Sequence, residues 1–249
     1  MENILDRANL SEDIILNYQP IVKCSGGSFE IYKYEVLSRL HVDGTIHYPN
    51  SFFEASKNKG LYNTIAKLIF CKSVMMLKEN KYLHLSVNVC YSNIKDYKTR
   101  KFILSKLELL SRDVCSRLTF EILETNKIKD FSMIIEFIDE VRFRGAKIAM
   151  DDFGTEYANY DNLLKINFDY IKIAGELIKD IVKSKKHFNV VRSLMNLCHE
   201  LEAKVIAEYV ENEHIMKTLC DINCEFMQGY FFGKPQLEPA KILLMENAY

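Results

Sequence analysis

The stretch that decides the fold is Lys147-Ile148-Ala149-Met150-Asp151-Asp152-Phe153-Gly154-Thr155. An apolar run that leads into two adjacent carboxylates, with a glycine two residues later, predicts a buried strand that ends at a turn. Adjacent strand residues point to opposite faces, so Asp151 and Asp152 can reach one site only if the chain leaves the strand between them. Gly154 makes such a departure easy. We therefore expect this strand to deliver acidic groups to the rim of a sheet.

Two other interpretations of Asp-Asp-Phe-Gly exist. One is a solvated turn without function, which the motif alone does not exclude. Other polar residues that converge on the motif would argue against it. The other is a protein kinase, because Asp-Phe-Gly is a kinase motif. The kinase alternative fails, since the sequence has neither a His-Arg-Asp catalytic loop nor a Gly-x-Gly-x-x-Gly phosphate cover.

Length and charge limit the class of protein. The 249 residues match the usual size of a (β/α)8 barrel, and we expect one domain over residues 1–249. With 33 basic and 34 acidic residues the net charge is −1, which excludes a basic field for duplex nucleic acid and a polybasic membrane face. The sequence has no apolar run of about 18 residues and no signal-peptide pattern, so we expect a cytoplasmic protein without a membrane span.

The seven cysteines are odd in number, scattered along the chain and free of any Cys-x-x-Cys pair. We expect reduced, mostly buried thiols, as in a cytoplasmic protein. Cys220 and Cys224 lie close together in sequence, but two cysteines alone are too few for a zinc site.

The N-terminal part of the chain predicts two strands over residues 14–22 and 29–37. The connection between them is too short for a crossover helix, so these strands should be antiparallel. After them, short strands alternate with amphipathic segments. The later strands are expected over residues 82–88, 118–121, 147–151, 170–173, 204–207 and 226–229.

The segments between the later strands have helical periodicity, as Ile134, Ile138 and Val141 illustrate within one of them. Eight strands, of which the last six alternate with helices, predict an α/β fold: a (β/α)8 TIM-type barrel with an antiparallel first strand. An open doubly wound sheet is the second possible architecture.

Polar side chains fall within or just after the predicted strands, about one strand–helix unit apart. They are Glu35, Asn88, Glu121, Asp151, Asp152, Lys172, Glu208 and Gln228. In a barrel the C-terminal ends of the strands meet at one face, so these residues should converge. Each of them alone has a plainer explanation, as a helix cap or a surface carboxylate.

So many acids at one face would repel one another without cations. Carboxylate and amide oxygens without accompanying histidine or cysteine suit Mg²⁺ or Mn²⁺ rather than Zn²⁺. The Asp151-Asp152 pair suggests that two ions share a carboxylate, an arrangement that activates water for phosphoester hydrolysis.

At these residues the sequence resembles the EAL-domain family, the bacterial phosphodiesterases of cyclic di-GMP. The resemblance extends over nearly the whole chain, and its motifs occur in the family's order. The matching motifs are Tyr34-Glu35-Val36-Leu37-Ser38-Arg39, Ser86-Val87-Asn88, Phe120-Glu121-Ile122-Leu123-Glu124, Met150-Asp151-Asp152-Phe153-Gly154-Thr155, Tyr170-Ile171-Lys172-Ile173, Ile206-Ala207-Glu208-Tyr209-Val210-Glu211 and Gln228-Gly229-Tyr230-Phe231-Phe232-Gly233-Lys234-Pro235.

The resemblance implies a role for each of these residues. Glu35, Asn88, Glu121 and Asp151 would hold one metal ion, and Asp151, Asp152 and Glu208 the second. Lys172 would orient and polarise the attacking water, next to the catalytic Glu208. Arg39 would bind a phosphate, Gln228 and Glu211 would line the nucleotide pocket, and Glu124 would support the loop after Gly154. The implied reaction opens cyclic di-GMP to linear pGpG.

Four departures from the family pattern stand out. Val36 replaces an alanine, a change that we expect to be tolerated. Ala174 replaces the aspartate of Lys-Ile-Asp, which removes a carboxylate beside Lys172. Glu156 and Tyr209 each replace a glycine, the first in a loop that couples dimerisation to the metal site in the family.

Three functions remain open at this point. The first is an active Mg²⁺- or Mn²⁺-dependent phosphodiesterase, because every implied metal ligand and Lys172 are present. The second is a catalytically silent receptor that binds cyclic di-GMP and signals to a partner protein. The third is a protein-interaction module that has lost the ligand. The resemblance also implies a homodimer.

Overall fold

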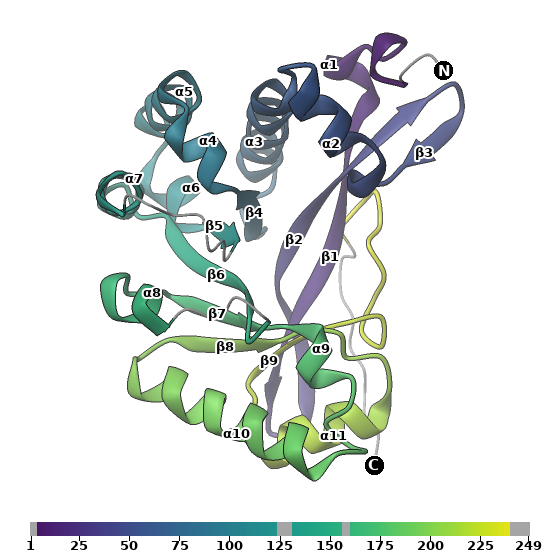
Figure 1. The fold of residues 1–249 in the computed structure, drawn as a ribbon, viewed down its shortest axis with the longest axis vertical. Helices are drawn as coiled ribbons and strands as arrows, with labels where there is room; N and C mark the ends of the chain where they lie inside the picture. Colours follow the sequence, from purple (N-terminus) through teal and green to yellow (C-terminus); the bar gives the residue numbers. More distant parts are fainter. Residues whose placement is uncertain (1–3, 124–130, 156–159, 240–249) are drawn as a thin grey trace.

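The computed structural model describes residues 4–123, 131–155 and 160–239. Its centre is a closed barrel of eight strands, with a short ninth strand, β3, added to β2 (Figure 1). The strands are β1 (Ile14–Ser25), β2 (Ser28–Val42), β3 (Thr45–His47), β4 (Leu85–Val89), β5 (Leu118–Leu123), β6 (Lys147–Phe153), β7 (Tyr170–Ile173), β8 (Lys204–Ala207) and β9 (Phe226–Gln228).

The strand order confirms the predicted barrel. Around it the strands follow the order β1, β9, β8, β7, β6, β5, β4 and β2, and a pairing between β1 and β2 closes the ring. β1 is antiparallel to both of its neighbours, whereas the other neighbouring strands of the barrel are parallel. The closing pairing excludes the open doubly wound sheet.

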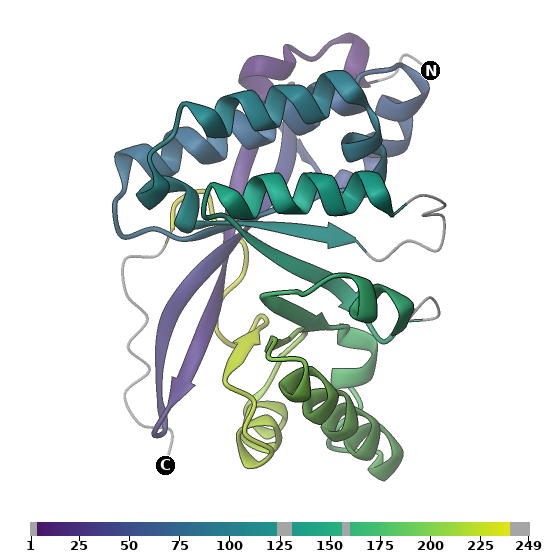
Figure 2. The ribbon, with the colours of Figure 1, turned by 90° about the vertical axis from the view of Figure 1, so that its left-hand side faces the viewer.

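Helices connect the strands and lie on the outside of the barrel (Figures 1 and 2). They are η1 (Ile4–Asp6), α1 (Leu10–Asp13), α2 (Pro49–Asn58), α3 (Tyr62–Glu79), α4 (Tyr91–Lys95), α5 (Tyr97–Glu108), α6 (Arg112–Ser116), α7 (Ser132–Phe143), α8 (Tyr160–Lys165), α9 (Gly175–Ile178), α10 (Lys185–Glu200) and α11 (Glu213–Asp221). Within the described residues, none of these helices is both long and apolar enough to cross a membrane.

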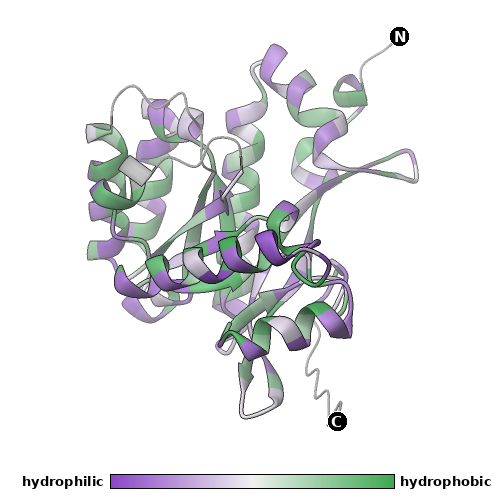
Figure 3. Ribbon diagram, turned by 60° about the horizontal axis from the view of Figure 1, so that its bottom comes forward, coloured by the Kyte–Doolittle hydropathy of each residue, from purple (hydrophilic) through white to green (hydrophobic). Residues whose placement is uncertain are grey.

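Three apolar clusters hold the fold together. The largest lies between the strands and the helices, where for example Phe120 of β5 packs with Phe137 of α7. The helices in Figure 3 carry both hydrophilic and hydrophobic residues, as expected for elements that bury one face. A second cluster contains Ile14, Leu40 and Phe52. The third fills the inside of the barrel and is called the barrel floor below. Its buried members are Ile21, Ala149, Tyr170, Ile206 and Phe226.

The first hairpin differs from the prediction in length. β2 extends to Val42, and the Asp43-Gly44 turn then leads into β3, which the sequence analysis missed. Asp43 and Gly44 have φ of 51° and 73°, the backbone conformation that a two-residue hairpin turn requires. β3 therefore has a clear sequence signal in retrospect.

The cysteines agree only in part with the prediction. All seven are free thiols. The expectation that most are buried is wrong, because Cys115, Cys198 and Cys224 are buried but the other four are partly exposed. Cys24 lies in β1, Cys71 in α3 and Cys220 in α11, and Cys90 directly precedes α4.

Candidate active site

Lys172 of β7 lies at the centre of a ring of polar side chains at one end of the barrel, called the polar ring below. The ring also contains Glu35, Asn88, Glu121, Asp151, Asp152, Glu208 and Gln228. The Nζ atom of Lys172 is within ion-pair distance of four carboxylates that come from different parts of the chain. The partners are Glu208 at 2.7 Å, Asp151 at 2.8 Å, Glu121 at 3.0 Å and Glu35 at 3.1 Å. Lys172 is 1% exposed, so this ammonium group is removed from water and depends on the carboxylates for its stabilisation.

The strand register explains why these groups meet. Glu121 of β5 pairs with Ala149 of β6, and Asp151 lies two residues further along the same strand. Residues two apart on a strand share a face, so Glu121 and Asp151 both point into the barrel. The same period places Lys172 above Tyr170 on β7. The parallel strands thus present their last inward-facing residues at one end of the barrel.

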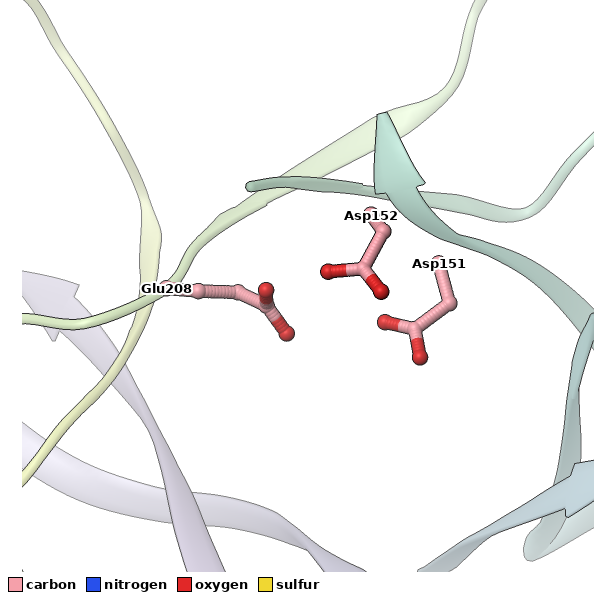
Figure 4. Close-up of side chains that lie close together, drawn as sticks. All are labelled: Asp151, Asp152 and Glu208. Atoms are coloured by element: carbon pink, nitrogen blue, oxygen red, sulfur yellow. The ribbon is translucent and has the colours of Figure 1, made fainter. Parts of the chain in front are cut away.

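Asp151 and Asp152 reach the same site because the strand is irregular between them. The pairing of β6 with β7 changes register between Met150 and Phe153, and Asp152 has a φ of 57°. This left-handed conformation turns the Asp152 side chain towards Asp151 (Figure 4). The chain therefore leaves the strand between Asp151 and Asp152, as the sequence predicted. Gly154, with a φ of 97°, continues the turn.

Asp151, Asp152 and Glu208 form a compact acidic triad. One oxygen of each carboxylate lies within 4.8 Å of the others, a spacing that fits a shared cation. Figure 4 shows the three side chains pointing towards one another from the end of β6 and from the residue that follows β8. Asp151 and Glu208 belong both to this triad and to the group of carboxylates around Lys172, so they link the two.

Glu35 is held from two sides by amides. Asn88 of β4 donates a hydrogen bond from Nδ2 to Glu35 Oε1 at 3.1 Å, and Gln228 of β9 donates from Nε2 to Oε2 at 2.7 Å. The Oε1 atom of Gln228 is buried without a hydrogen-bond partner among the described residues. Glu35, Asn88 and Gln228 therefore have fixed positions in the ring.

Burial and crowding shift the pKa values of the acids. Burial raises the pKa of Glu121 to about 7 and that of Glu208 to about 8, and it also raises the pKa of Asp152. Burial acts in the same direction on Glu35, but Lys172 and the hydrogen bonds from Gln228 and Asn88 outweigh it and lower the pKa.

The lysine responds in the opposite sense. Burial lowers the pKa of Lys172, but the surrounding carboxylates, with Asp151 first, outweigh burial and hold it well above its ordinary value. Lys172 is therefore a permanent positive charge at neutral pH. The pKa values of Glu121, Glu208 and Asp152 stay raised because the single charge of Lys172 does not offset their burial and mutual repulsion.

The residues of the ring fit divalent cations. Five carboxylates face one ammonium group, which leaves a formal excess of negative charge that additional cations would offset. Among the described residues, the Oε1 atom of Glu121 is buried without a hydrogen-bond partner, as expected for a ligand atom. The donors are all oxygens, the set that Mg²⁺ and Mn²⁺ prefer.

A pocket of about 560 Å³ opens beside the ring. Glu35, Asp152 and Glu208 form part of its wall, so a ligand in the pocket would reach the acids directly. Two of the residues predicted to bind substrate, Glu211 and Gln228, also line it. The sequence analysis gave no role to the other lining residues, which are Gln19, Gly175, Glu176, Lys179, Tyr209, Gly229 and Tyr230.

Arg39 lies four residues beyond Glu35 on β2. Its guanidinium stacks over the ring of Tyr48, with 4.7 Å between Cζ and the ring centroid, and donates a hydrogen bond to the carbonyl oxygen of Ser38. Burial lowers its pKa against the attraction of Tyr48, Tyr230 and Glu35. Arg39 is thus close to the ring but does not bind its carboxylates.

Three of the four family departures can be located, and the first of them, Val36, is buried in β2. Ala174 is 1% exposed and precedes α9, one residue beyond the end of β7. Tyr209 has a φ of 58°, a conformation that glycine adopts freely and tyrosine rarely. A Cβ atom on Gly175 would lie only 2.6 Å from Tyr209 Cβ, so the glycine makes room for the tyrosine. Glu124 and Glu156 lie outside the described residues.

One buried residue near the site was missed by the sequence analysis. Lys33 is 2% exposed, and its Nζ atom lies 3.7 Å from the centroid of the Tyr170 ring. Burial lowers its pKa to about 7. Lys33 lies two residues before Glu35 on the same face of β2, and this spacing could have indicated that its side chain also points into the barrel.

Comparisons with known proteins identify the family. The model of the EAL domain matches residues 2–235. The cyclic di-GMP phosphodiesterase PdeB of Shewanella oneidensis is 30% identical over 232 residues, which cover 90% of this chain and 26% of that protein. The chain therefore spans about a quarter of the length of this relative.

Two solved structures have the same fold. An EAL domain protein from Listeria monocytogenes is 23% identical with a TM-score of 0.86, covering 94% of this chain and 92% of that chain. The EAL domain of FimX from Pseudomonas aeruginosa, described as bound to c-di-GMP, is 22% identical with a TM-score of 0.83, covering 94% and 96%. From the extent of the family match, the chain belongs to the EAL domain family.

Proposed function

We propose that this chain hydrolyses cyclic di-GMP to linear pGpG with the help of two divalent ions, Mg²⁺ or Mn²⁺. The observation that carries this proposal is the ring of four carboxylates around Lys172, two of which, Asp151 and Glu208, form an acidic triad with Asp152. The name of the relative from Shewanella oneidensis and the ligand of FimX support cyclic di-GMP as the substrate.

The acids and amides at the strand ends would hold the ions. Glu35, Asn88, Glu121 and Asp151 would hold one, and Asp151, Asp152 and Glu208 the other. When bound, such ions would make water more acidic at the site and offset the charge of the phosphate.

The remaining steps belong to the side chains. Lys172 would orient the attacking water and supply a fixed positive charge next to the reacting phosphate. Glu208, whose side chain is 18% exposed, would accept the proton that the water loses. The water oxygen would bond to phosphorus while one P–O3′ bond breaks, and the ribose O3′ would leave with a proton.

The residues around the pocket would bind the rest of the substrate. Arg39 would bind a phosphate through its planar set of donors. Gln228 and Glu211 would contact the nucleotide in the pocket that they line. We also propose that residues 1–249 act as one unit in the cytoplasm, as a homodimer open to a regulatory protein partner.

A second function is favoured by Ala174. The aspartate expected beside Lys172 is absent, and the buried methyl group of Ala174 supplies no oxygen ligand there. If this carboxylate is essential, the chain would bind cyclic di-GMP without hydrolysing it and act as a receptor.

One experiment separates these functions. The purified protein is incubated with cyclic di-GMP in Mg²⁺, in Mn²⁺ and in a chelator, and the products are separated by chromatography. The phosphodiesterase predicts pGpG with either ion and none with the chelator or in Asp151→Asn. Binding without pGpG would favour the receptor, and restored hydrolysis in Ala174→Asp would identify its cause. Absence of both binding and pGpG would overturn both functions.

A further inference from the structure

Two cysteines far apart in sequence meet at the end of the barrel opposite the candidate active site. Cys24 lies at the end of β1, and Cys220 lies in the last turn of α11. Their Sγ atoms are 3.5 Å apart although 196 positions separate them in the chain. Both are free thiols, so two reducing groups lie in contact without a bond between them.

Both cysteines lie at the surface of the molecule. Cys24 and Cys220 are partly exposed and line an open cavity of about 1,570 Å³. Lys204 and Glu225, at the starts of β8 and β9, line the same cavity, which places it at the N-terminal ends of the parallel strands. A small oxidant can therefore approach the sulfur atoms from this side without entering the barrel.

We propose that Cys24 and Cys220 form a reversible disulfide when the protein meets a low-molecular-weight disulfide such as oxidised glutathione. The Cys24 thiolate attacks the oxidant, forms a mixed disulfide and releases one thiolate. Cys220 then loses its proton and attacks the Cys24 sulfur, which releases the second thiolate. Two electrons pass from the two cysteines to the oxidant, and their two protons end on the two released thiols.

The surroundings of the two sulfur atoms assign the order of attack. Burial and the neighbouring Cys24 raise the pKa of Cys220 to about 12, and we therefore assign Cys220 the second step, at the Cys24 sulfur 3.5 Å away. Cys224 is not a competing partner. It is buried, its thiol donates a hydrogen bond to the carbonyl oxygen of Phe226 at 3.3 Å, and burial raises its pKa to about 12.

The disulfide would reinforce the seam between β1 and β9, the first and the last strand of the barrel in sequence. β1 and β9 are paired through three positions only, Ile21 with Gln228, Val22 with Met227 and Lys23 with Phe226. Cys24 extends this seam, because its N–H donates a hydrogen bond to the carbonyl oxygen of Glu225. A bond from Cys24 to α11, the helix that precedes β9, would hold the seam together covalently and close a long loop in the unfolded chain.

The test uses the intact protein before and after treatment with oxidised glutathione. After denaturation and alkylation of the remaining thiols, peptide mass spectrometry should find a Cys24–Cys220 cross-link that has lost two hydrogens and that dithiothreitol reverses. The thermal midpoint of the oxidised protein should rise by roughly 5 to 15 °C. Cys71→Ser, which removes another partly exposed thiol, should keep both effects, whereas Cys24→Ser and Cys220→Ser should lose them.

Other results would overturn the proposal. Alkylation of both Cys24 and Cys220 after oxidant treatment of the wild-type protein would mean that the thiols do not pair. A cross-link that joins Cys220 to Cys224 would show that proximity in sequence, not the fold, selects the partner. An unchanged thermal midpoint in protein that carries the cross-link would remove its stabilising role.

Discussion

The barrel floor and the polar ring above it, called the rim from here on, come from the same strands but contribute differently to the protein. Ala149, Tyr170 and Phe226 belong to the buried apolar floor, and two residues further along each strand lie Asp151, Lys172 and Gln228. The floor gains stability by removing apolar surface from water. The rim lowers the stability of the fold, because it removes from water charges that water would otherwise solvate.

The two layers should therefore respond differently to substitution. Substitutions in the floor should change the free energy of unfolding, with little direct effect on chemistry. Substitutions in the rim should change turnover, cation binding and the response to pH.

Phe226→Ala should be the most damaging change to the floor. Phe226 is 1% exposed and packs against Tyr170 and Tyr32, so its removal leaves a cavity. We expect a loss of about 3–5 kcal/mol in the free energy of unfolding, measured by urea denaturation. Phe143→Ala, which removes a ring that is 78% exposed, is the matched control and should change stability by less than about 0.5 kcal/mol. Equal effects of the two changes would refute the structural role of the floor.

Lys172→Met should have the largest effect on turnover. It removes the charge that orients water and stabilises the reacting phosphate, so kcat at saturating Mn²⁺ should fall by about 10²–10³-fold. In the absence of cations the variant should also be less stable, because the four carboxylates lose their shared partner, and Mn²⁺ should restore most of that loss. Lys183→Met, at an exposed position, is the control. A variant with wild-type kcat would contradict the role assigned to Lys172.

The pH dependence of stability should originate in the rim. The pKa values of Glu121 and Glu208 are raised from 4.5 to about 7 and about 8, so the folded protein binds more protons than the unfolded chain between these values. Stability of the cation-free protein should therefore fall as the pH rises from about 4.5 to about 8, by a few kcal/mol in total.

Urea denaturation at about pH 5 and about pH 7 measures this loss below the range in which Lys33, whose pKa is lowered to about 7, adds stability as the pH rises. Glu121→Gln should reduce it, whereas the exposed control Glu54→Gln should not. Saturating Mn²⁺ should also reduce it, because bound cations favour the ionised acids. A stability that rises with pH across this range would contradict the assignment.

Gly175→Ala should show the smallest effect, and it should depend on Tyr209. A Cβ on residue 175 would lie 2.6 Å from Tyr209 Cβ, so we expect a loss of about 1–2 kcal/mol in stability. In the Tyr209→Gly background the same change should be nearly neutral, because the clash is gone and glycine tolerates the φ of 58°. Additive effects in this double-mutant cycle would mean that the two residues do not depend on each other.

The sequence was sufficient for the barrel because its signals are local. Each buried strand appears as a short apolar run, and the short connection after β1 is enough to make the first pair antiparallel. The strand ends then follow, and with them the positions of Glu35, Glu121 and Lys172. The sequence analysis missed β3 because the strand has only three residues, although the Asp43-Gly44 turn indicates a hairpin there.

The remaining features depend on contacts that no local pattern contains. The approach of Cys24 to Cys220 requires the barrel to close, which brings β1 next to α11 and β9. The burial of Lys33 over Tyr170 depends on two strands that are not neighbours in the sheet. The conformation of Tyr209 is fixed by its neighbours, since Glu208 N–H bonds to β7 and Val210 N–H bonds to Gln228 of β9.

Calorimetric titration of the cation-free protein with Mn²⁺ measures directly whether the rim binds two cations. We expect two Mn²⁺ ions bound per chain in the wild type and one in Asp152→Asn, because asparagine keeps the φ of 57° at this position but removes a carboxylate from the triad. Absence of Mn²⁺ binding to the wild-type protein, or a stoichiometry that Asp152→Asn leaves unchanged, would contradict this expectation.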